Sequence, residues 1–234
     1  MATADKFELL NSGDLLVTGR LIDASNATLY AKVVADDVEL TCIYKPVAGE
    51  RPLWDFPDGT LADREYAAFL VSEFLELNVV PLTLLRDGPY GVGMVQEWIE
   101  IDESVDLASY FSKDLNVLRT MAFFDAIINN TDRKIGHLLP TSGGELFGCD
   151  HGVTFHHEDK LRTVLWQWAG DPLTAHEIDL LKKLQKGLGA TIILEPHLTS
   201  LEIEALDSRV ARFLQTSKMP LPNPDWPAIP WPAF

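Results

Sequence analysis

A dense group of chemically versatile side chains stands in the segment FFDAIINNTDRKIGHLL, residues 123–139. An apolar run ends in two asparagines, and an Asp-Arg-Lys triplet and a lone histidine follow. Most helices end instead in a glycine cap and a polar loop. An aspartate on a loop that leaves a helix can accept a hydroxyl proton or orient the hydroxyl. Asp132 is therefore a candidate catalytic base.

Two charged residues earlier in the chain could bind a nucleotide. Lys45 follows a β-branched and aromatic run and is itself followed by proline, which stops a strand. At that strand end it could supply a positive charge to the α- and β-phosphates. Glu65, on the next expected helix, is the best candidate to orient it. The small-residue hairpin turn at Ser25 and Asn26 could offer backbone amides to phosphate oxygens.

A second aspartate completes the pattern. Asp150 stands in GCDHG, 18 residues after Asp132, where a strand stops and glycine permits a sharp turn. Its carboxylate is a hard oxygen ligand suited to Mg²⁺. Taken alone, each residue has an ordinary structural explanation, such as a solvated lysine, a common turn or a local ion pair. Their order and spacing together favour the layout of kinase-type phosphoryl transfer.

The elements that must position these residues follow from periodicity and turn signals. We expect α+β structure, with residues 1–101 forming an N-terminal lobe and residues 102–234 a C-terminal lobe of one catalytic domain. The N-lobe strands are expected at 14–21, 28–34 and 38–44, with a helix at 61–75 and a strand pair between 79 and 100. The C-lobe helices are expected at 107–111, 115–129, 175–188 and 199–215, with a hairpin at 138–149. The proline-rich end from residue 219 is expected to pack across a surface groove.

The composition restricts the partners. The chain of 234 residues carries 35 acidic against 19 basic side chains, a formal charge of −16. Such a chain repels nucleic acid and anionic membranes, and it contains no cluster of basic residues to override that repulsion. Two distant cysteines in apolar contexts and a start without signal-peptide character predict a cytoplasmic protein.

Several segments carry a family resemblance. NNTDRKIGH and LFGCDHG resemble the catalytic and metal loops of the phosphatidylinositol 3-/4-kinase-related superfamily. More closely, YKPVAGERPLWDFPDGTLADRE, GMVQEWI and the terminal IPWPAF resemble an actinobacterial family of small kinase-like members of that superfamily. This resemblance covers nearly the whole chain. It implies a two-lobed protein-kinase-like fold, with an antiparallel β-rich N-lobe and a mainly helical C-lobe.

The resemblance also implies roles for individual residues. Asp132 falls on the catalytic aspartate, and Lys134 beside it would face the developing phosphoryl charge. Lys45 falls on the nucleotide lysine and Asp150 on the metal aspartate. The hinge, whose backbone would hold the adenine of ATP, matches Gln96, Glu97, Trp98 and Ile99. Asp125, before the catalytic loop, resembles the buried aspartate that braces the loop.

One position departs from the superfamily pattern. His137 stands where the superfamily has an asparagine that binds the second metal. An imidazole nitrogen suits Mn²⁺ better than Mg²⁺. His137 is thus a metal ligand, or it hydrogen-bonds Asp132 or Asp150 without touching the metal, and the sequence leaves both roles open.

The sequence leaves four candidate functions. The leading one is an ATP- and Mg²⁺- or Mn²⁺-dependent phosphotransferase that acts on a protein, including itself, or on a small hydroxylated molecule. The second is a nucleotide-binding pseudokinase with a regulatory role, and the third is a phosphoinositide kinase, against which the acidic charge counts. The fourth, zinc hydrolysis, would use histidines whose spacing fits no zinc pattern, and two of them would point to opposite faces of a strand. These histidines are His137, His151, His156 and His157.

Overall fold

The N-terminal half of the chain is built on one antiparallel sheet. The structure, a computed structural model, describes residues 3–21 and 26–234. The sheet has the strand order β1-β2-β3-β5-β4. Its strands are β1 (Asp14–Arg20), β2 (Leu29–Ala35), β3 (Val38–Pro46), β4 (Thr83–Gly88) and β5 (Gly91–Glu97). All five strands were expected from the sequence, within a few residues.

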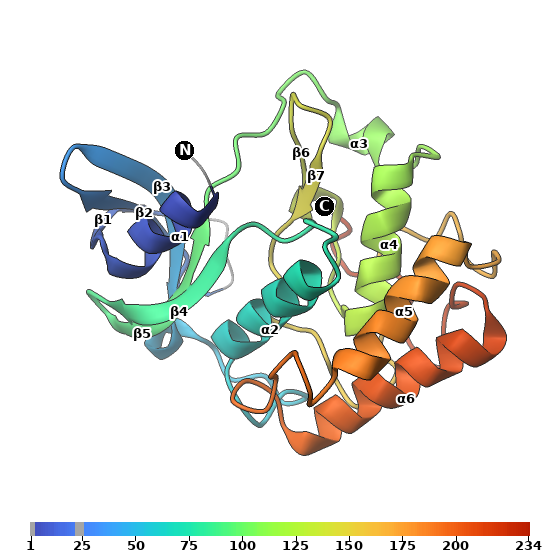
Figure 1. Cartoon of the computed structure of the whole chain (residues 1–234). Helices are drawn as coiled ribbons and strands as arrows, with labels where there is room; N and C mark the ends of the chain where they lie inside the picture. The colour runs from blue at the N-terminus through green and yellow to red at the C-terminus, as the bar shows by residue number, and fades with distance from the viewer. Residues whose placement is uncertain (1–2, 22–25) are drawn as a thin grey trace.

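Two helices pack against this sheet (Figure 1). The first, α1 (Thr3–Ser12), was not predicted, because its apolar residues are few and two of them are adjacent. Leu9 and Leu10 nevertheless bury it against the sheet. The second, α2 (Leu61–Phe74), was predicted. It begins after Thr60, whose hydroxyl accepts a hydrogen bond from a backbone N–H in the first turn.

The C-terminal half is mainly helical, as expected. Its helices are α3 (Leu107–Tyr110), α4 (Asn116–Ile128), α5 (Ala175–Gly187) and α6 (Ser200–Thr216). The short strands β6 (Leu138–Pro140) and β7 (Leu146–Gly148) form the predicted hairpin. Single 3₁₀ turns lie at Val47–Gly49 (η1) and Ile135–His137 (η2). Thr174 and Thr199 precede α5 and α6, and both form capping boxes.

The two halves share one hydrophobic core. Apolar residues of α4, such as Met121, Phe124 and Ile127, are fully buried beneath neighbours from both halves. A buried ion pair also joins them, because the Arg64 guanidinium on α2 lies 2.6 Å from Glu202 on α6. The boundary at residues 101 and 102 stays a prediction.

The proline-rich end of the chain lies on the C-terminal half, as predicted. The Ala228 carbonyl accepts hydrogen bonds from the Thr163 N–H at 3.0 Å and the Trp166 indole at 2.9 Å. The Ala233 carbonyl accepts one from the Ile135 N–H at 2.9 Å. The chain end is thus joined to the loop that follows α4.

Across residues 3–21 and 26–234, every helix is too short or too polar to cross a membrane.

Strand β3 runs one residue further than the sequence indicated. Proline was expected to stop the strand after Lys45, but Pro46 still pairs, opposite Gly93 of β5. Proline has no backbone N–H to donate, but its carbonyl can still accept a hydrogen bond. It can therefore occupy the last paired position of a strand. At Gly93 a Cβ atom would lie 2.5 Å from the Lys45 carbonyl oxygen and 2.6 Å from Pro46 Cα. Only glycine allows the two strands to approach this closely.

We therefore expect Gly93→Ala to destabilise the fold by about 1–3 kcal/mol, because backbone atoms must move to relieve the overlap. Urea denaturation measures the change. Gly19→Ala is the matched control, since a Cβ there meets nothing closer than 3.8 Å. Equal stability of the two variants would show that β5 can move away from Lys45 at no cost.

Candidate active site

Lys45 lies between two carboxylates that come from different parts of the chain. Its Nζ is 2.7 Å from Glu65 Oε1 on α2 and 2.8 Å from Asp150 Oδ1 after β7. Burial alone would lower the pKa of Lys45, but the two carboxylates outweigh it and raise the pKa above its ordinary value. The ammonium group is therefore charged and held in one place.

Glu65 is the buried member of this trio, with 1% of its surface exposed. Its second oxygen accepts a hydrogen bond from the His151 N–H at 2.9 Å. The Asp150 side chain is half exposed, and its backbone has a φ of 62°. Aspartate tolerates this left-handed conformation better than most residues. The neighbouring Lys45 holds the pKa of Asp150 well below its usual range.

The loop after α4 is supported by a fully buried ion pair. Asp125 and Arg133 are both 0% exposed, and Arg133 Nη2 donates to Asp125 Oδ1 at 2.9 Å. Asn130 extends the support, because its amide donates to Asp125 and its carbonyl oxygen accepts the Asp132 N–H. The same Arg133 donates to the Cys149 carbonyl at 2.9 Å. One guanidinium group therefore fixes the loop that carries Asp132 relative to the segment that carries Asp150.

Asp132 lies in this loop with a quarter of its side chain exposed. Two cations flank its carboxylate: Lys134 Nζ at 3.4 Å and Arg162 Nη2 at 3.6 Å. Burial raises the pKa of Asp132, and Asp150 raises it further, while the two cations oppose them. A carboxylate with a raised pKa is a better proton acceptor. Arg162 was not singled out from the sequence, because nothing in its local pattern connects it to a loop 30 residues earlier.

His137 reaches the same cluster from η2. Its Nε2 lies 3.6 Å from Asp150 Oδ2, and its Nδ1 accepts a hydrogen bond of 3.4 Å from the Lys134 N–H. Burial lowers the pKa of His137 to about 4, so the ring is neutral at pH 7. With Nδ1 acting as an acceptor, the ring proton is on Nε2 and faces the carboxylate.

The predicted phosphate turn is described only in part. Ser25 lies outside the described residues. Asn26 accepts the Arg51 N–H at 3.0 Å through its side-chain oxygen and lines the same cleft as Lys45.

The predicted hinge lies at the end of β5. The Gln96 side chain is buried and donates to Thr83 Oγ1 at 2.9 Å, so only its backbone could contact adenine. The N–H groups of Glu97 and Trp98 already donate to carbonyls of neighbouring segments. Hinge contacts to adenine therefore stay a prediction, to be carried by Ile99 or by backbone carbonyls.

Several of the predicted residues line one cleft of about 600 Å³, a volume typical of small-molecule sites, whereas His137 and the hinge residues 96–99 are not among its lining residues. Lys45, Glu65, Asp132, Lys134 and Asp150 all line it. The sequence thus identified residues that the fold brings together, and their chemical roles stay predictions.

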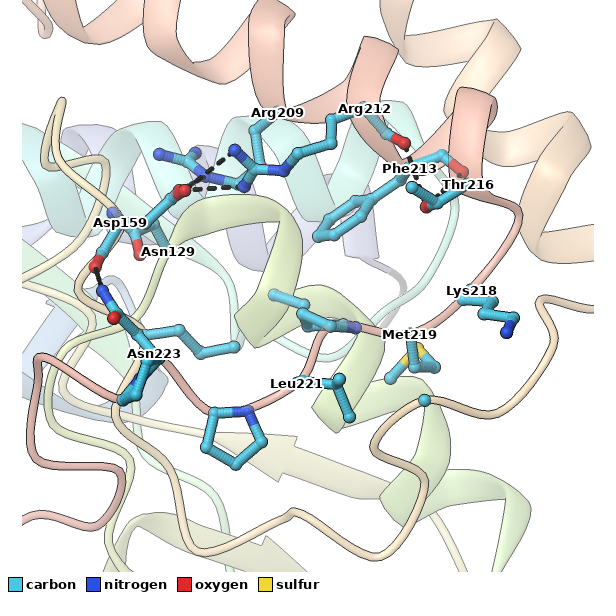
Figure 2. A pocket seen from close by; sticks show the side chains of 16 residues that line it. Asn129, Asp159, Arg209, Arg212, Phe213, Thr216, Lys218, Met219, Leu221 and Asn223 are labelled. Carbon is cyan, nitrogen blue, oxygen red and sulfur yellow. Dashed lines mark hydrogen bonds and ion pairs between the residues drawn. The ribbon is translucent and has the colours of Figure 1, made fainter.

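A separate pocket of about 590 Å³ lies between α6 and the segment that follows it. Figure 2 shows Arg209 and Arg212 meeting Asp159 on one side of it. Met219 and Leu221 make the rest more apolar. Lys45, Asp132 and Asp150 do not line this pocket, so it is distinct from the cleft.

The histidines do not form the zinc site that the sequence left as an alternative. His156 and His157 were expected on opposite faces of a strand, but their rings stack at 4.5 Å, because this segment is a loop. They and Glu158 could together approach a metal. However, His156 Nδ1 accepts the Glu158 N–H, and its Nε2 lies 3.2 Å from the Lys160 ammonium group. Both ring nitrogens are already engaged.

A β-rich lobe and a helical lobe that meet at this cleft define a protein-kinase-like fold. The Golgi casein kinase with Mn/ADP bound is a structural neighbour, with a TM-score of 0.59, 14% identity, and coverage of 91% of this chain and 74% of that one. The structure of hydra Fam20 with sugar gives a TM-score of 0.57 and 12% identity, covering 90% of this chain and 86% of that one.

A sequence relative then gives the family. Protein Rv2133c of Mycobacterium tuberculosis is 42% identical over 267 aligned residues, which cover 98% of this chain and 96% of that protein. The chain belongs to the family of Protein Rv2133c. The sequence matches no family model.

The buried pair beneath the loop leads to a stability test. Asp125→Asn should cost about 3–5 kcal/mol, because it leaves the Arg133 charge buried without its counter-ion. Urea denaturation followed by circular dichroism measures the loss. Asp179→Asn removes an exposed carboxylate paired with Lys182 and should change stability by less than about 0.5 kcal/mol. A loss equally small at Asp125 would contradict the bracing role.

Proposed function

We propose that this chain is an ATP- and divalent-metal-dependent phosphotransferase of the phosphatidylinositol 3-/4-kinase-like type. Its acceptor is a protein, including the chain itself, or a small hydroxylated molecule. The observation that carries the proposal is the meeting of Lys45, Glu65, Asp150 and Asp132 in one cleft of a kinase-like fold. The Golgi casein kinase, a structural neighbour, was solved with Mn/ADP bound, which agrees with this choice of substrate and metal.

The side chains present fit a nucleotide and a divalent metal. Lys45 carries a fixed positive charge, which suits phosphate oxygens, and Asp150 offers a half-exposed carboxylate, which suits Mg²⁺ or Mn²⁺. A bound metal would offset the negative charge of the phosphates. Lys45 and Asp150 are the residues that would hold these groups.

Asp132 would act on the acceptor. As the acceptor oxygen bonds to the γ-phosphorus and the bond to the β-phosphate oxygen breaks, the hydroxyl proton passes to the Asp132 carboxylate. Lys134, 3.4 Å from that carboxylate, lies where it can stabilise charge on the transferred group.

A phosphoinositide acceptor is disfavoured by the segment after Asp150. Its lysine, Lys160, is buried and lies over the rings of Trp54 and Trp226. Its arginine, Arg162, is bound to the catalytic loop. These cations are therefore not free to meet the phosphates of an inositol headgroup, and the chain as a whole carries a charge of −16.

The nucleotide site can be tested by calorimetry. Lys45→Met should weaken ATP binding roughly 10- to 100-fold, since one charge-assisted hydrogen bond contributes about 1.5–3 kcal/mol. Asp150→Asn should remove the dependence of ATP binding on divalent metal. Lys32→Met, which removes an exposed lysine of β2, is the control and should bind ATP normally. Unchanged affinity in both cleft variants would contradict the nucleotide site.

The catalytic role is tested separately. Asp132→Asn should leave ATP affinity nearly unchanged and lower the rate of phosphoryl transfer about 10²- to 10⁴-fold, the usual contribution of a general base. Transfer from γ-labelled ATP, including transfer to the chain itself, gives the rate. If the wild-type chain binds ATP and metal but transfers nothing, the pseudokinase alternative replaces this proposal.

The geometry favours a positioning role for His137. Its Nδ1 accepts the Lys134 N–H, which favours the tautomer with the proton on Nε2, and Nε2 lies 3.6 Å from Asp150 Oδ2, where it can orient that carboxylate. His137→Asn should therefore weaken Mn²⁺ and Mg²⁺ alike, by about 10- to 100-fold as for other groups that orient a ligand. Metal titrations in the presence of ATP measure both affinities. A shift of preference from Mn²⁺ towards Mg²⁺ in the variant would instead identify His137 as a ligand.

A further inference from the structure

Three tryptophans line the cleft that contains Asp132, and we call them the tryptophan wall. Trp54 belongs to the loop before α2, and Trp226 and Trp231 belong to the proline-rich chain end. Trp54 is 84% exposed and Trp231 is 91% exposed. Tryptophan is rarely left this accessible, because its large apolar surface gains most from contact. Two such rings beside a candidate catalytic base indicate a surface that stacks on a ligand.

The wall is held in place by the C-terminal lobe. The Lys160 ammonium group lies 5.3 Å from the ring centre of Trp54 and 5.0 Å from that of Trp226. Lys160 itself is only 6% exposed and is paired with Glu158 at 3.2 Å. This cation therefore joins a loop of the N-terminal lobe to the chain end.

Trp231 is exposed on an anchored backbone. The Ala228 carbonyl, before it, is held by Thr163, and the Ala233 carbonyl, after it, is held by Ile135 of η2. The backbone on both sides of Trp231 is thus fixed, and its ring lines the cleft with almost nothing covering it. A rigid aromatic side chain loses little conformational freedom when a ligand stacks on it.

The polar groups of the cleft suit hydroxyl groups. Planar side chains that can bind hydroxyls, such as Asn26, Arg51 and Asp55, line the cleft as well. The described lining residues carry four basic and five acidic side chains, so beyond the charges proposed to bind ATP and metal they leave no excess positive charge for an anionic acceptor.

We propose that the acceptor is a small, uncharged, polyhydroxylated ring, a monosaccharide or a cyclitol. Its C–H face stacks on the tryptophan wall, and one hydroxyl faces Asp132. This inference rests on the proposed phosphotransferase function and names its acceptor.

The reaction balances with the residues already described. The ring hydroxyl gives its proton to Asp132, its oxygen forms the new bond to the γ-phosphorus, and ADP leaves. The products are a phosphate monoester of the ring and ADP, and no oxidant or further reactant is needed.

Binding is tested first, without catalysis. Saturation-transfer NMR would be recorded on the full chain in the presence of ADP and Mg²⁺, without Mn²⁺. The probes would be glucose, N-acetylglucosamine and myo-inositol. At least one probe should bind to the wild type, and Trp231→Ala and Trp54→Ala should each weaken its binding roughly 3- to 10-fold, as expected for the loss of one aromatic contact. Trp231→Phe should retain most of the affinity. Leu201→Ala, which truncates an exposed apolar residue of α6, is the control and should change nothing.

Transfer from γ-labelled ATP is measured next. The tryptophan variants should raise the KM for the bound probe with kcat and the KM for ATP unchanged. The proposal is overturned if none of the probes binds, if the variants change only the KM for ATP, or if a peptide is labelled with a KM that depends on Trp231. If a probe binds through the tryptophans while ATP does not bind at all, the phosphotransferase function fails and the polyol site stands.

Discussion

The buried carboxylate of Glu65 is the constraint on which the rest of the cleft depends. A carboxylate with 1% exposure needs partners for its oxygens, because burial of an unpaired charge costs several kcal/mol. Its partners are the Lys45 ammonium group on β3 and the His151 N–H after β7. One side chain on α2 therefore sets the position of a strand in one lobe and of a loop in the other. The preceding residue, Arg64, adds a second buried link to α6.

A second buried ion pair supports the loop that carries Asp132. Asp125 and Arg133 satisfy each other at 0% exposure, and the remaining donors of Arg133 reach the Cys149 carbonyl and His151. Because one guanidinium group holds both loops, their acidic side chains cannot move independently without breaking a buried network. Such preorganisation is what electrostatic catalysis requires, since groups that are already aimed at the reacting atoms need not reorganise during the reaction.

The sequence predicted the features of the fold and of the cleft that depend on local patterns. Helix α2 follows from apolar periodicity, and α5 and α6 begin at the threonines that the sequence offers as caps. Four residues that line the cleft follow from the order of a strand-end lysine, a helix-borne glutamate and two loop aspartates. Contacts that depend on the path of a loop were missed. Arg162 reaches Asp132 only because the segment after Asp150 turns back along the catalytic loop. The stacking of His156 on His157 and the extension of β3 through Pro46 were missed for the same reason, since tertiary contacts decide them.

The arrangement around Lys45 also indicates what nucleotide binding must change. The Lys45 ammonium group is paired with two carboxylates. The Asp150 side chain is half exposed, whereas the Glu65 side chain is almost fully buried. Under the proposed function, phosphate oxygens would compete with Asp150 for Lys45, and a metal would compete with Lys45 for Asp150. Both would weaken the ion pair between the two side chains. The Glu65 contact would persist, since Glu65 is almost fully buried and is also held by the His151 N–H. The Asp150 carboxylate would then pair with the metal, and the Lys45 ammonium group would pair with phosphate. Binding of nucleotide and metal should therefore be mutually favourable, because either one alone would break an ion pair and leave one of its members uncompensated.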